Sequence, residues 1–343
     1  MKSPWSNIAL LFILVILTVT GYLGLVSGYE HAAWRLWLHG IAAYALFFLF
    51  IWKSSIILDA YRRKNQWTRQ RLIFAVLLTM LLLTALLGLV WTLDGPRYWA
   101  GFSYVSLHIY LAIPVMLIML WHAWRMRFIF RVKGALERRL FLRVMATAAA
   151  GFLFWRTAES GKKALAWDGA RRRFTGSYEQ GSHSGYFPAT SWLFDNPRPV
   201  DLDAWRLEVR GLVKRPTTLN YEQLLGLPPT TREVLLDCTS GWYTVQEWQG
   251  VLVADLLRKL ELNGEAASIT VQSISGYKRR FPIAQAGQML LATHVAGQPL
   301  SHAHGAPLRL VIDGRRGYDW VKWVGFLQVN GTNAIWQSPL PLR

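Results

Sequence analysis

The sequence predicts an N-terminal all-α transmembrane helix bundle, of four helices plus a fifth crossing, followed by a mixed α/β, β-rich domain. The chain has 343 residues, enough for two domains, and 52% of them are hydrophobic. Four long apolar runs lie in its first third, each close to the ~20 residues that cross a bilayer as a helix. From about Arg171 the pattern changes to short alternating runs separated by Gly and Pro, which is typical of strands and turns.

The four apolar runs define the predicted bundle. They cover Ile8–Val26, Leu36–Trp52, Leu72–Leu93 and Tyr104–Trp124. Lys and Arg gather in the connector 53–71 and in the connector after residue 124, whereas the two other connectors carry few. Because cytoplasmic loops are enriched in Lys and Arg, we expect the N-terminus on the cytoplasmic side of a bacterial inner membrane. The same bias explains the net charge of +18 and disfavours nucleic acid as a partner.

A shorter apolar run, Val144–Trp155, predicts the fifth crossing. The segment before it, Glu137–Arg143, reads ERRLFLR. It resembles a twin-arginine export signal, although Glu137 departs from the pattern at the first position and Arg143 replaces the final Lys. An ordinary positively charged anchor explains the charges as well. Under either interpretation, residues after about 160 lie in the periplasm.

Two histidines lie at similar depth inside the bundle, His39 in the second run and His108 in the fourth. Polar residues within a span are costly and usually functional, and paired imidazoles bind haem iron with no open site, which favours electron transfer. His122 lies 14 residues after His108, about 21 Å along a helix, and could serve a second haem. Gly40 would let the flat macrocycle approach the backbone. Alternatively, each histidine is a hydrogen-bonded polar group at a helix contact.

These features resemble the bacterial four-helix cytochrome b family over about residues 5–130. The resemblance implies haem b and electron exchange with the quinol/quinone pool. That family usually has another histidine at the cytoplasmic start of its first span, where this chain has Ser6, Asn7 and Ile8. We therefore expect one haem b, held by His39 and His108, and leave a second haem open.

Cys238 is the only cysteine in the chain. A lone thiol cannot form an internal disulfide, and an exposed thiol is a liability in an oxidising compartment. A soft thiolate suits a heavy transition metal. The alternative is a buried, inert cysteine.

Strands and short helices are expected around this cysteine. The clearest strands are Trp205–Arg210, Ser268–Val271 and Leu308–Ile312, and the expected helices are Tyr221–Leu225, Val253–Leu260 and Ile283–Leu291. The ordered segments CTSGW at 238–242, SGY at 275–277, HGAPLRLV at 304–311 and GYDWVKWV at 317–324 resemble the molybdopterin domain of the sulfite oxidase superfamily. The match covers about residues 170–340 and is strongest with its periplasmic methionine sulfoxide reductase-like branch.

The resemblance implies that Cys238 is the protein ligand of molybdenum and that Tyr277 lies near the metal. Molybdopterin carries a phosphate and many polar edges, so its site needs backbone amides and cations. The candidates for cofactor binding are Ser240, Gly241, His304, Arg309, Arg316, Lys322 and, from an earlier segment, His183. Lys322 matches the lysine that the family has in this position. Each of the others could instead be a solvated surface residue.

We expect three parts: a haem b-binding transmembrane domain at 1–130, a connector with the twin-arginine-like motif and fifth span at 131–165, and a periplasmic molybdopterin oxidoreductase domain at 166–343. The expected function is reduction of an S-oxide or N-oxide by electrons from quinol. Thr239–Trp242 stands where sulfite oxidases have an arginine-bearing segment, which argues against sulfite. Arg232, Arg279 or Arg280 could supply the missing cation.

Two alternatives stay open. The first is a sulfite-type dehydrogenase that passes electrons through haem b to quinone, and the second is a non-enzymatic membrane cytochrome with a binding module. The expected partners are the lipid bilayer, the quinone pool and the twin-arginine export machinery.

Overall fold

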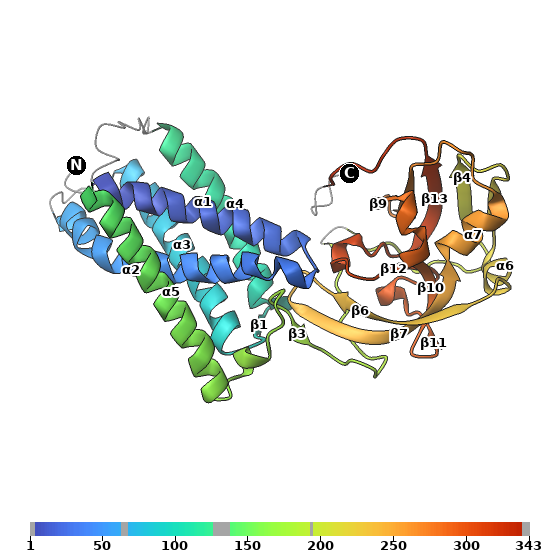
Figure 1. Ribbon diagram of the computed structural model, residues 1–343, viewed down its shortest axis with the longest axis horizontal. Helices are drawn as coiled ribbons and strands as arrows, with labels where there is room; N and C mark the ends of the chain where they lie inside the picture. The colour runs from blue at the N-terminus through green and yellow to red at the C-terminus, as the bar shows by residue number, and fades with distance from the viewer. Residues whose placement is uncertain (1–3, 63–67, 126–137, 193–194, 338–343) are drawn as a thin grey trace. The chain divides into compact units, whose positions relative to one another are not determined.

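The computed structural model describes residues 4–62, 68–125, 138–192 and 195–337 (Figure 1). The chain divides into two compact units, Met1–Tyr178 and Glu179–Arg343. The first is helical and the second is rich in sheet, as the sequence predicts. Residues 166–178 belong to the helical unit, whereas the sequence analysis assigned them to the C-terminal domain.

Five long helices form the first unit: α1 (Pro4–Val26), α2 (Trp34–Arg62), α3 (Arg69–Leu93), α4 (Tyr104–Arg125) and α5 (Arg138–Ala164). A short 3-10 turn, η1 (Glu30–Ala32), precedes α2, and a small hairpin of β1 (Tyr98–Trp99) and β2 (Phe102–Ser103) joins α3 to α4. Within this unit α1 and α5 pack against α2, and α3 packs against α4. Small and branched residues such as Ala42, Ala45 and Leu49 form their shared core.

In the described part of the chain, four helices are long and apolar enough to cross a membrane, and they match the four predicted spans. Their outer faces expose large apolar side chains; Phe12 is 60% exposed and Leu117 is 56% exposed. Apolar helix faces of this kind are favourable in contact with lipid and unfavourable in contact with water. Helix α5 is not one of the four, so the fifth crossing stays a prediction. Arg138 and Arg139 of the twin-arginine-like motif begin α5, and Glu137 lies outside the described residues.

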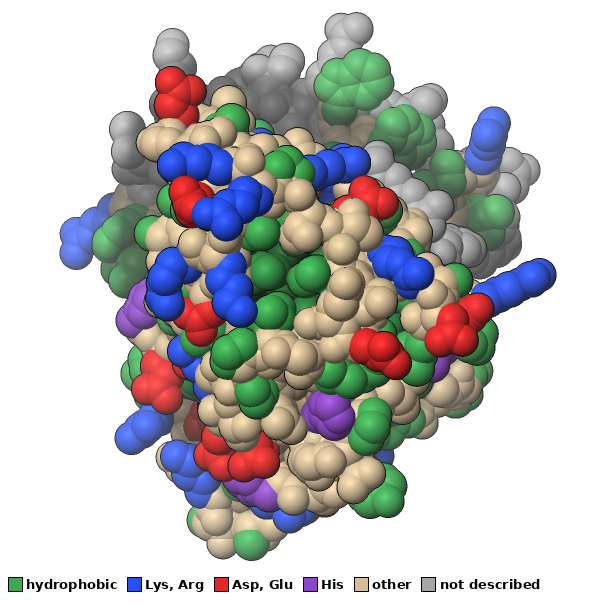
Figure 2. Space-filling view, turned by 90° about the vertical axis from the view of Figure 1, so that its right-hand side faces the viewer, with side chains coloured by type: hydrophobic (Ala, Val, Ile, Leu, Met, Phe, Trp, Pro, Cys, Tyr) green, Lys and Arg blue, Asp and Glu red, His purple; other side chains and the backbone are tan. Residues whose placement is uncertain are grey.

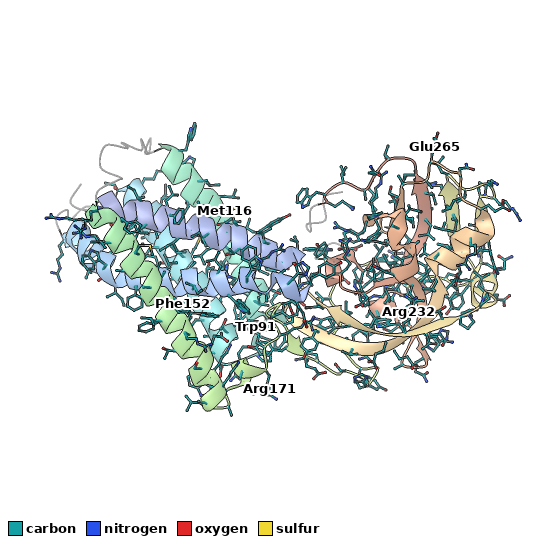
Figure 3. All side chains as sticks on the ribbon, viewed as in Figure 1. Trp91, Met116, Phe152, Arg171, Arg232 and Glu265 are labelled. Atoms are coloured by element: carbon teal, nitrogen blue, oxygen red, sulfur yellow. The ribbon has the colours of Figure 1, made fainter. Side chains whose placement is uncertain are left out.

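The segment after α5 returns to the C-terminal end of α3 through the 3-10 turn η3 (Asp168–Arg171). Trp91, only 2% exposed, donates its indole N–H to the Gly176 carbonyl at 2.8 Å. Tyr178 donates its hydroxyl to the Trp91 carbonyl at 2.5 Å, and the two rings meet edge to face (Figure 3 labels Trp91). Because the last carbonyls of a helix lack partners within it, this contact caps α3 and anchors the segment.

The second unit contains two sheets. The first has the order β11 (Gln298–Pro299), β10 (Met289–Val295), β7 (Trp242–Leu252) and β3 (Tyr178–Glu179), with β12 (Arg309–Ile312) paired to β10 and β6 (Thr230–Asp237) paired to β7. The second has the order β5 (Thr217–Leu219), β4 (Leu207–Gly211), β13 (Val324–Asn330), β8 (Ser268–Ser273) and β9 (Lys278–Pro282). Strands β13 and β4 pair in parallel, and β6 and β7 form a long antiparallel hairpin.

Short helical elements cover the sheets. Helices α6 (Tyr221–Leu225) and α7 (Val253–Leu260) lie where the sequence predicts them, and α6 begins with an Asn220 capping box. The helix predicted at 283–291 is wrong. A 3-10 helix, η4 (Ile283–Gln288), is followed directly by β10, because Met289–Ala292 are buried on both faces of the sheet and so show no alternation. On one face of this unit, acidic and basic side chains are interspersed (Figure 2).

The anchor on α3 yields a first prediction. Tyr178→Phe keeps the ring but removes the hydroxyl that caps the Trp91 carbonyl, so it should destabilise the helical unit by about 1 kcal/mol. Thermal unfolding of the detergent-solubilised chain measures this as a lower Tm. Tyr186→Phe, at a tyrosine that is 86% exposed, is the matched control. Equal Tm values for the two variants would show that the hydrogen bond contributes nothing.

Candidate functional site

Cys238 lies in the tight connection between β6 and β7. Its backbone N–H donates to the Trp242 carbonyl at 2.8 Å, and its carbonyl accepts from the Gly241 N–H at 3.1 Å. Gly241 has a φ of 94°, a conformation that favours glycine. The Cys238 side chain is 9% exposed, and its sulfur lies 3.1 Å from the Ser240 hydroxyl oxygen. The hairpin therefore fixes the sulfur at one end of the sheet.

A buried ion pair between Arg316 and Asp237 holds the loop that carries Cys238. Arg316 donates to the Asp237 carboxylate at 2.9 Å, and both side chains are 3% exposed. A second guanidinium nitrogen of Arg316 contacts the Cys238 carbonyl at 3.4 Å. The sequence predicted Arg316 as a cofactor contact. The structure gives it a different partner, the loop that carries the cysteine.

The irregular segment 187–192 closes over the same loop. The Thr190 hydroxyl lies 3.2 Å from the Ser240 hydroxyl and accepts the Trp242 indole N–H at 3.1 Å. The Lys322 ammonium donates to the Thr190 carbonyl at 2.9 Å and to the Ser191 hydroxyl at 3.0 Å. Ser240, Gly241 and Lys322 are thus brought together with Cys238. Thr190 was missed by sequence reasoning because it lies in no regular element and matches no spacing pattern.

Arg309 is a buried cation in the same region. Its side chain is 3% exposed, and its guanidinium lies 5.4 Å from the ring centroids of both Trp248 and Trp320. One guanidinium nitrogen donates to the His304 carbonyl at 3.1 Å, and the buried Nε has no hydrogen-bond partner in the described part of the chain. Burial lowers the pKa of Arg309 to about 10.

Lys322 shares this environment. Burial, followed by the charge of Arg309, lowers the pKa of Lys322 to about 7. Within the ranges that the structure describes, neither Arg309 nor Lys322 forms an ion pair with a carboxylate. A buried guanidinium without a counter-charge is unfavourable, so the region around Arg309 is suited to bind an anionic group.

His304 uses both ring nitrogens within the protein. Nδ1 lies 2.9 Å from the Ser301 hydroxyl, and Nε2 lies 3.1 Å from the Phe187 carbonyl. The imidazole also packs on the Phe187 ring, with centroids 4.1 Å apart. Burial, then the charge of Arg309, lowers the pKa of His304 to about 4, so the ring is neutral. His304 therefore holds the segment that begins at Phe187.

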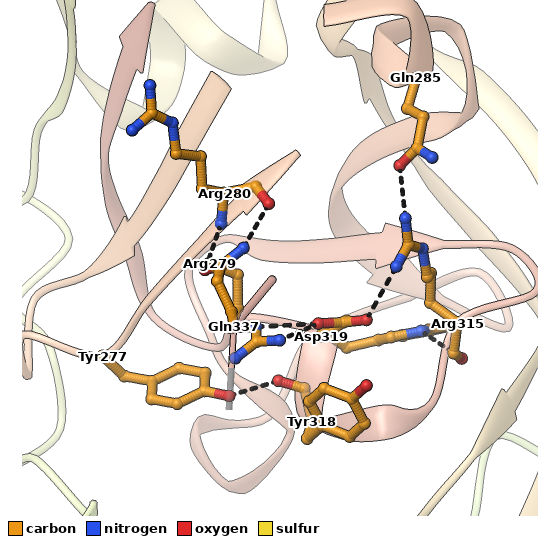
Figure 4. Close-up of polar contacts among 9 residues, drawn as sticks. Tyr277, Arg279, Arg280, Gln285, Arg315, Tyr318, Asp319 and Gln337 are labelled. Atoms are coloured by element: carbon orange, nitrogen blue, oxygen red, sulfur yellow. Dashed lines mark hydrogen bonds and ion pairs between the residues drawn. The ribbon is translucent and has the colours of Figure 1, made fainter. Parts of the chain in front are cut away.

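A buried polar network connects Tyr277 to the turn next to the Cys238 loop (Figure 4). Its hydroxyl donates to the Tyr318 carbonyl, in the turn η6 (Gly317–Asp319). A Cβ at Gly317 would lie 3.3 Å from the Cα of Cys238, so this turn abuts the cysteine loop. Burial raises the pKa of Tyr277 to about 12. Asp319 fixes the turn through an ion pair with Arg279 at 2.8 Å.

His183 is not brought to the site. Its ring lies 3.4 Å from the Glu233 carboxylate, and its side chain is 63% exposed. Glu233 precedes Cys238 by five residues along an extended strand, which is about 16 Å. The prediction that His183 contacts the cofactor is therefore not supported by its position.

His39 and His108 do come together in the helical unit. Their ring centroids are 6.1 Å apart, with the planes at 77°. His39 Nδ1 lies 3.0 Å from the Leu17 carbonyl on α1, and His108 Nδ1 lies 2.7 Å from the Thr84 carbonyl on α3. Donation from Nδ1–H leaves the lone pair of Nε2 available for a metal on each ring. Since a metal–imidazole bond is about 2 Å long, two rings that share one metal have centroids about 6 Å apart.

Glycines on the neighbouring helices make room for these imidazoles. A Cβ at Gly21 of α1 would lie 3.1 Å from His39, and one at Gly88 of α3 would lie 3.0 Å from His108. Gly40 was predicted to face a macrocycle, but a Cβ there would lie 2.9 Å from Trp155 of α5, so that interpretation is wrong. His122 lies in α4, and its side chain is outside the described residues.

The ion pair between Asp237 and Arg316, next to Cys238, yields a second prediction. Asp237→Asn leaves Arg316 buried without its carboxylate, which should cost about 3 kcal/mol and lower the Tm of the C-terminal unit. Asp255→Asn removes a carboxylate whose ion pair with Arg258 is exposed, and it is the control. The prediction fails if both variants unfold at the same temperature.

Comparisons with known proteins agree with this site. Residues 194–334 match the family described as "Oxidoreductase molybdopterin binding domain". The uncharacterized oxidoreductase YuiH of Bacillus subtilis is 30% identical over 148 residues, which cover 42% of this chain and 75% of that protein. The protein-methionine-sulfoxide reductase catalytic subunit MsrP of Gluconobacter oxydans is 30% identical over 155 residues, 39% of this chain and 48% of its own.

MsrP of Ralstonia nicotianae is 28% identical over 136 residues, 34% of this chain and 41% of its own, so this chain spans at most about half of these MsrP relatives. Among solved structures, the sulfane dehydrogenase SoxCD of Paracoccus pantotrophus matches at 28% identity with a TM-score of 0.38, over 39% of this chain and 40% of that one. The family match and the coverage of YuiH identify the C-terminal unit. The chain belongs to the family of oxidoreductases with a molybdopterin-binding domain.

Proposed function

We propose that this oxidoreductase is anchored in a bacterial inner membrane, takes electrons from quinol through haem b, and reduces an S-oxide or N-oxide in the periplasm. The observation that carries the proposal is the Cys238 sulfur, held at the end of β6 in a region where, among the residues that the structure describes, Arg309 and Lys322 form no ion pair with a carboxylate. A thiolate and buried cations together suit a metal bound by an anionic pterin.

The residues present fit the molybdenum cofactor. Cys238 would ligate the metal, and Ser240, Arg309 and Lys322 would bind the pterin and its phosphate. The buried Nε of Arg309, which has no partner among the residues described by the structure, would find an acceptor there. When bound, this cofactor supplies oxygen-atom transfer, in which an S-oxide takes up two electrons and two protons and becomes a sulfide and water.

The surroundings of Cys238 favour a neutral substrate. The three arginines that could replace the missing sulfite-binding cation are engaged elsewhere. Arg232 donates to the Gly287 carbonyl at 2.9 Å (Figure 3), Arg279 pairs with Asp319 at 2.8 Å, and Arg280 donates to the Ser268 hydroxyl at 2.6 Å. A sulfoxide is polar but uncharged, so it needs no such cation. The name of the MsrP relatives, protein-methionine-sulfoxide reductase, also favours an S-oxide.

The histidine pair supports haem b as the electron carrier. His39 and His108 lie at the separation that one shared iron requires, and each Nδ1 is bound to a carbonyl of another helix. Backbone acceptors of this kind orient axial imidazoles and keep Nε2 available. His122 would serve a second haem only with a partner that the sequence does not reveal.

We further propose that the N-terminus and the basic connectors are cytoplasmic and that the molybdopterin domain is exported. The bias of Lys and Arg between connectors supports the orientation. The adjacent Arg138 and Arg139 support the use of the twin-arginine machinery, which moves folded domains. A cofactor inserted in the cytoplasm would then reach the periplasm already bound.

Cys238→Ala tests the molybdenum site. Loss of the metal ligand should abolish reduction of methionine sulfoxide by a reduced dye, while the haem absorbance of the purified chain stays unchanged. A paired assay supplies trimethylamine N-oxide with reduced dye, or sulfite with oxidised dye. Turnover with sulfite alone would reverse the proposed direction of electron flow, and retained sulfoxide reduction by the variant would exclude Cys238 as the ligand.

His39→Ala and His108→Ala test the haem site. Each removes one of two axial ligands, so the absorbance of the haem should be lost in both variants, while sulfoxide reduction by a dye that acts directly on the C-terminal unit continues. His31→Ala is the control, because His31 is exposed and stacks on Tyr29 with centroids 5.5 Å apart. An unchanged haem spectrum in both variants would rule out this pair.

A further inference from the structure

A group of polar side chains at the C-terminal end of α5 has no role in the functions described above. Lys162 is only 3% exposed and donates to the Glu159 carboxylate at 2.8 Å. Arg172, from the segment that follows η3, lies 3.6 Å from the same carboxylate and donates to the Thr92 hydroxyl at 2.7 Å. One carboxylate is therefore held between two cations at the end of the helix.

The Tyr44 hydroxyl on α2 belongs to this group. It is buried, and among the described residues it has no hydrogen-bond partner. On α2, Gly40 and Phe48 lie about one helical turn before and after Tyr44, and they meet Trp155 and Phe154 of α5. Tyr44 therefore faces α5, the helix that carries Glu159. A buried hydroxyl without a partner costs about 1–3 kcal/mol, so such groups usually face a ligand or an ordered water. The observation points to a bound molecule that offers a hydroxyl or carbonyl oxygen.

The same group lies close to the histidine pair. Tyr44 follows His39 by five residues on α2, which is about 7.5 Å along the helix axis. A redox molecule bound at Tyr44 would therefore lie within short electron-transfer range of His39.

Aromatic side chains extend from the polar group to the lipid-facing surface. Trp155 of α5 packs against Trp37 at 6.5 Å and against Phe152 at 6.0 Å between ring centroids. Trp37 is 53% exposed and Phe152, labelled in Figure 3, is 48% exposed. Gly40 allows Trp155 to approach α2 closely. These aromatic side chains give the polar group an apolar, lipid-facing border, which suits a planar ring with an apolar tail.

We propose that Tyr44, Glu159 and Arg172 form the site that binds the quinol. This inference rests on the proposed function and adds the residues and the proton route. A quinol presents two hydroxyl groups on opposite sides of a flat ring, which suits one contact with Tyr44 and one with Glu159. Oxidation breaks both O–H bonds and yields the quinone, two electrons and two protons.

The protons and electrons released by quinol oxidation each have an acceptor. The Glu159 carboxylate accepts the first proton, and water at the end of α5 accepts the second. The two electrons would pass, one at a time, to the haem iron that His39 and His108 would hold. Reduction of the S-oxide to a sulfide and water consumes two electrons and two protons, so the overall reaction balances.

Two measurements test the site on the full-length chain in detergent. Isothermal titration of decylubiquinone should show a Kd raised about 10-fold by Tyr44→Phe, the worth of one hydrogen bond to a polar ligand. Stopped-flow reduction by decylubiquinol should fall at least about 10-fold in Glu159→Gln relative to reduction by dithionite. The controls are Tyr110→Phe, at a tyrosine that is 43% exposed, and Asp94→Asn, at an exposed carboxylate paired with Arg97 at 2.6 Å.

Glu159→Asp is a second variant in case loss of the charge unfolds α5. It keeps the carboxylate but shortens its reach, so the KM for decylubiquinol should rise while the Tm follows that of Asp94→Asn. Values for Tyr44→Phe and Glu159→Gln within twofold of their controls would overturn the proposed site. If the purified chain holds no haem, the proposed function fails, and the titration of decylubiquinone alone still decides whether this site exists.

Discussion

The buried ion pair between Asp237 and Arg316 is the constraint on which the geometry around Cys238 depends. It ties the end of β6 to the turn that contains Gly317, and a second contact from Arg316 reaches the Cys238 carbonyl. On the other side, the Arg279–Asp319 pair holds the same turn against β9. The sulfur is thus placed by two ion pairs that water does not reach. Side chains held in this way lose little entropy when a cofactor binds.

Charge balance around Cys238 explains why these residues suit a cofactor. Asp237 and Asp319 are neutralised by Arg316 and Arg279, whereas Arg309 and Lys322 remain without carboxylates in the described ranges. Cation–π contacts with the Trp248 and Trp320 rings stabilise the guanidinium of Arg309. An anionic ligand would neutralise this positive charge. In the helical unit, the corresponding features are the Tyr44 hydroxyl, which is buried without a partner among the described residues, and the Glu159 carboxylate that Lys162 and Arg172 contact.

Much of the architecture could be predicted from the sequence. The four spans follow from hydropathy alone. Helix α6 begins with a capping box, and α7 shows helical periodicity in its buried residues Val253, Leu256, Leu257 and Leu260. The helix predicted at 283–291 failed because a strand buried on both faces shows the same unbroken apolar run as a buried helix. His39 and His108 lie next to each other, as expected from their depth, because depth within a span can be counted along the chain. Their role as haem ligands stays a prediction. Gly40 was misassigned because the sequence does not reveal which neighbour a helix face meets.

The candidate site was predicted less completely than the fold. Cys238, Ser240 and Lys322 were found through the motif, and they do lie together. Thr190 was missed, and His183 was misplaced by its proximity in sequence. The roles of Arg316 and His304 were assigned from charge alone, whereas their partners, Asp237 and Phe187, are distant in the sequence. Such contacts depend on tertiary structure, which local patterns do not encode.

The most direct test is metal analysis of the purified, detergent-solubilised chain, with molybdenum and haem iron quantified in the same sample. A thiolate site in one unit and a paired imidazole site in the other predict molybdenum and haem iron in equal amounts, with the pterin recovered on extraction. Iron without molybdenum, or a preparation that yields no pterin, would contradict the account.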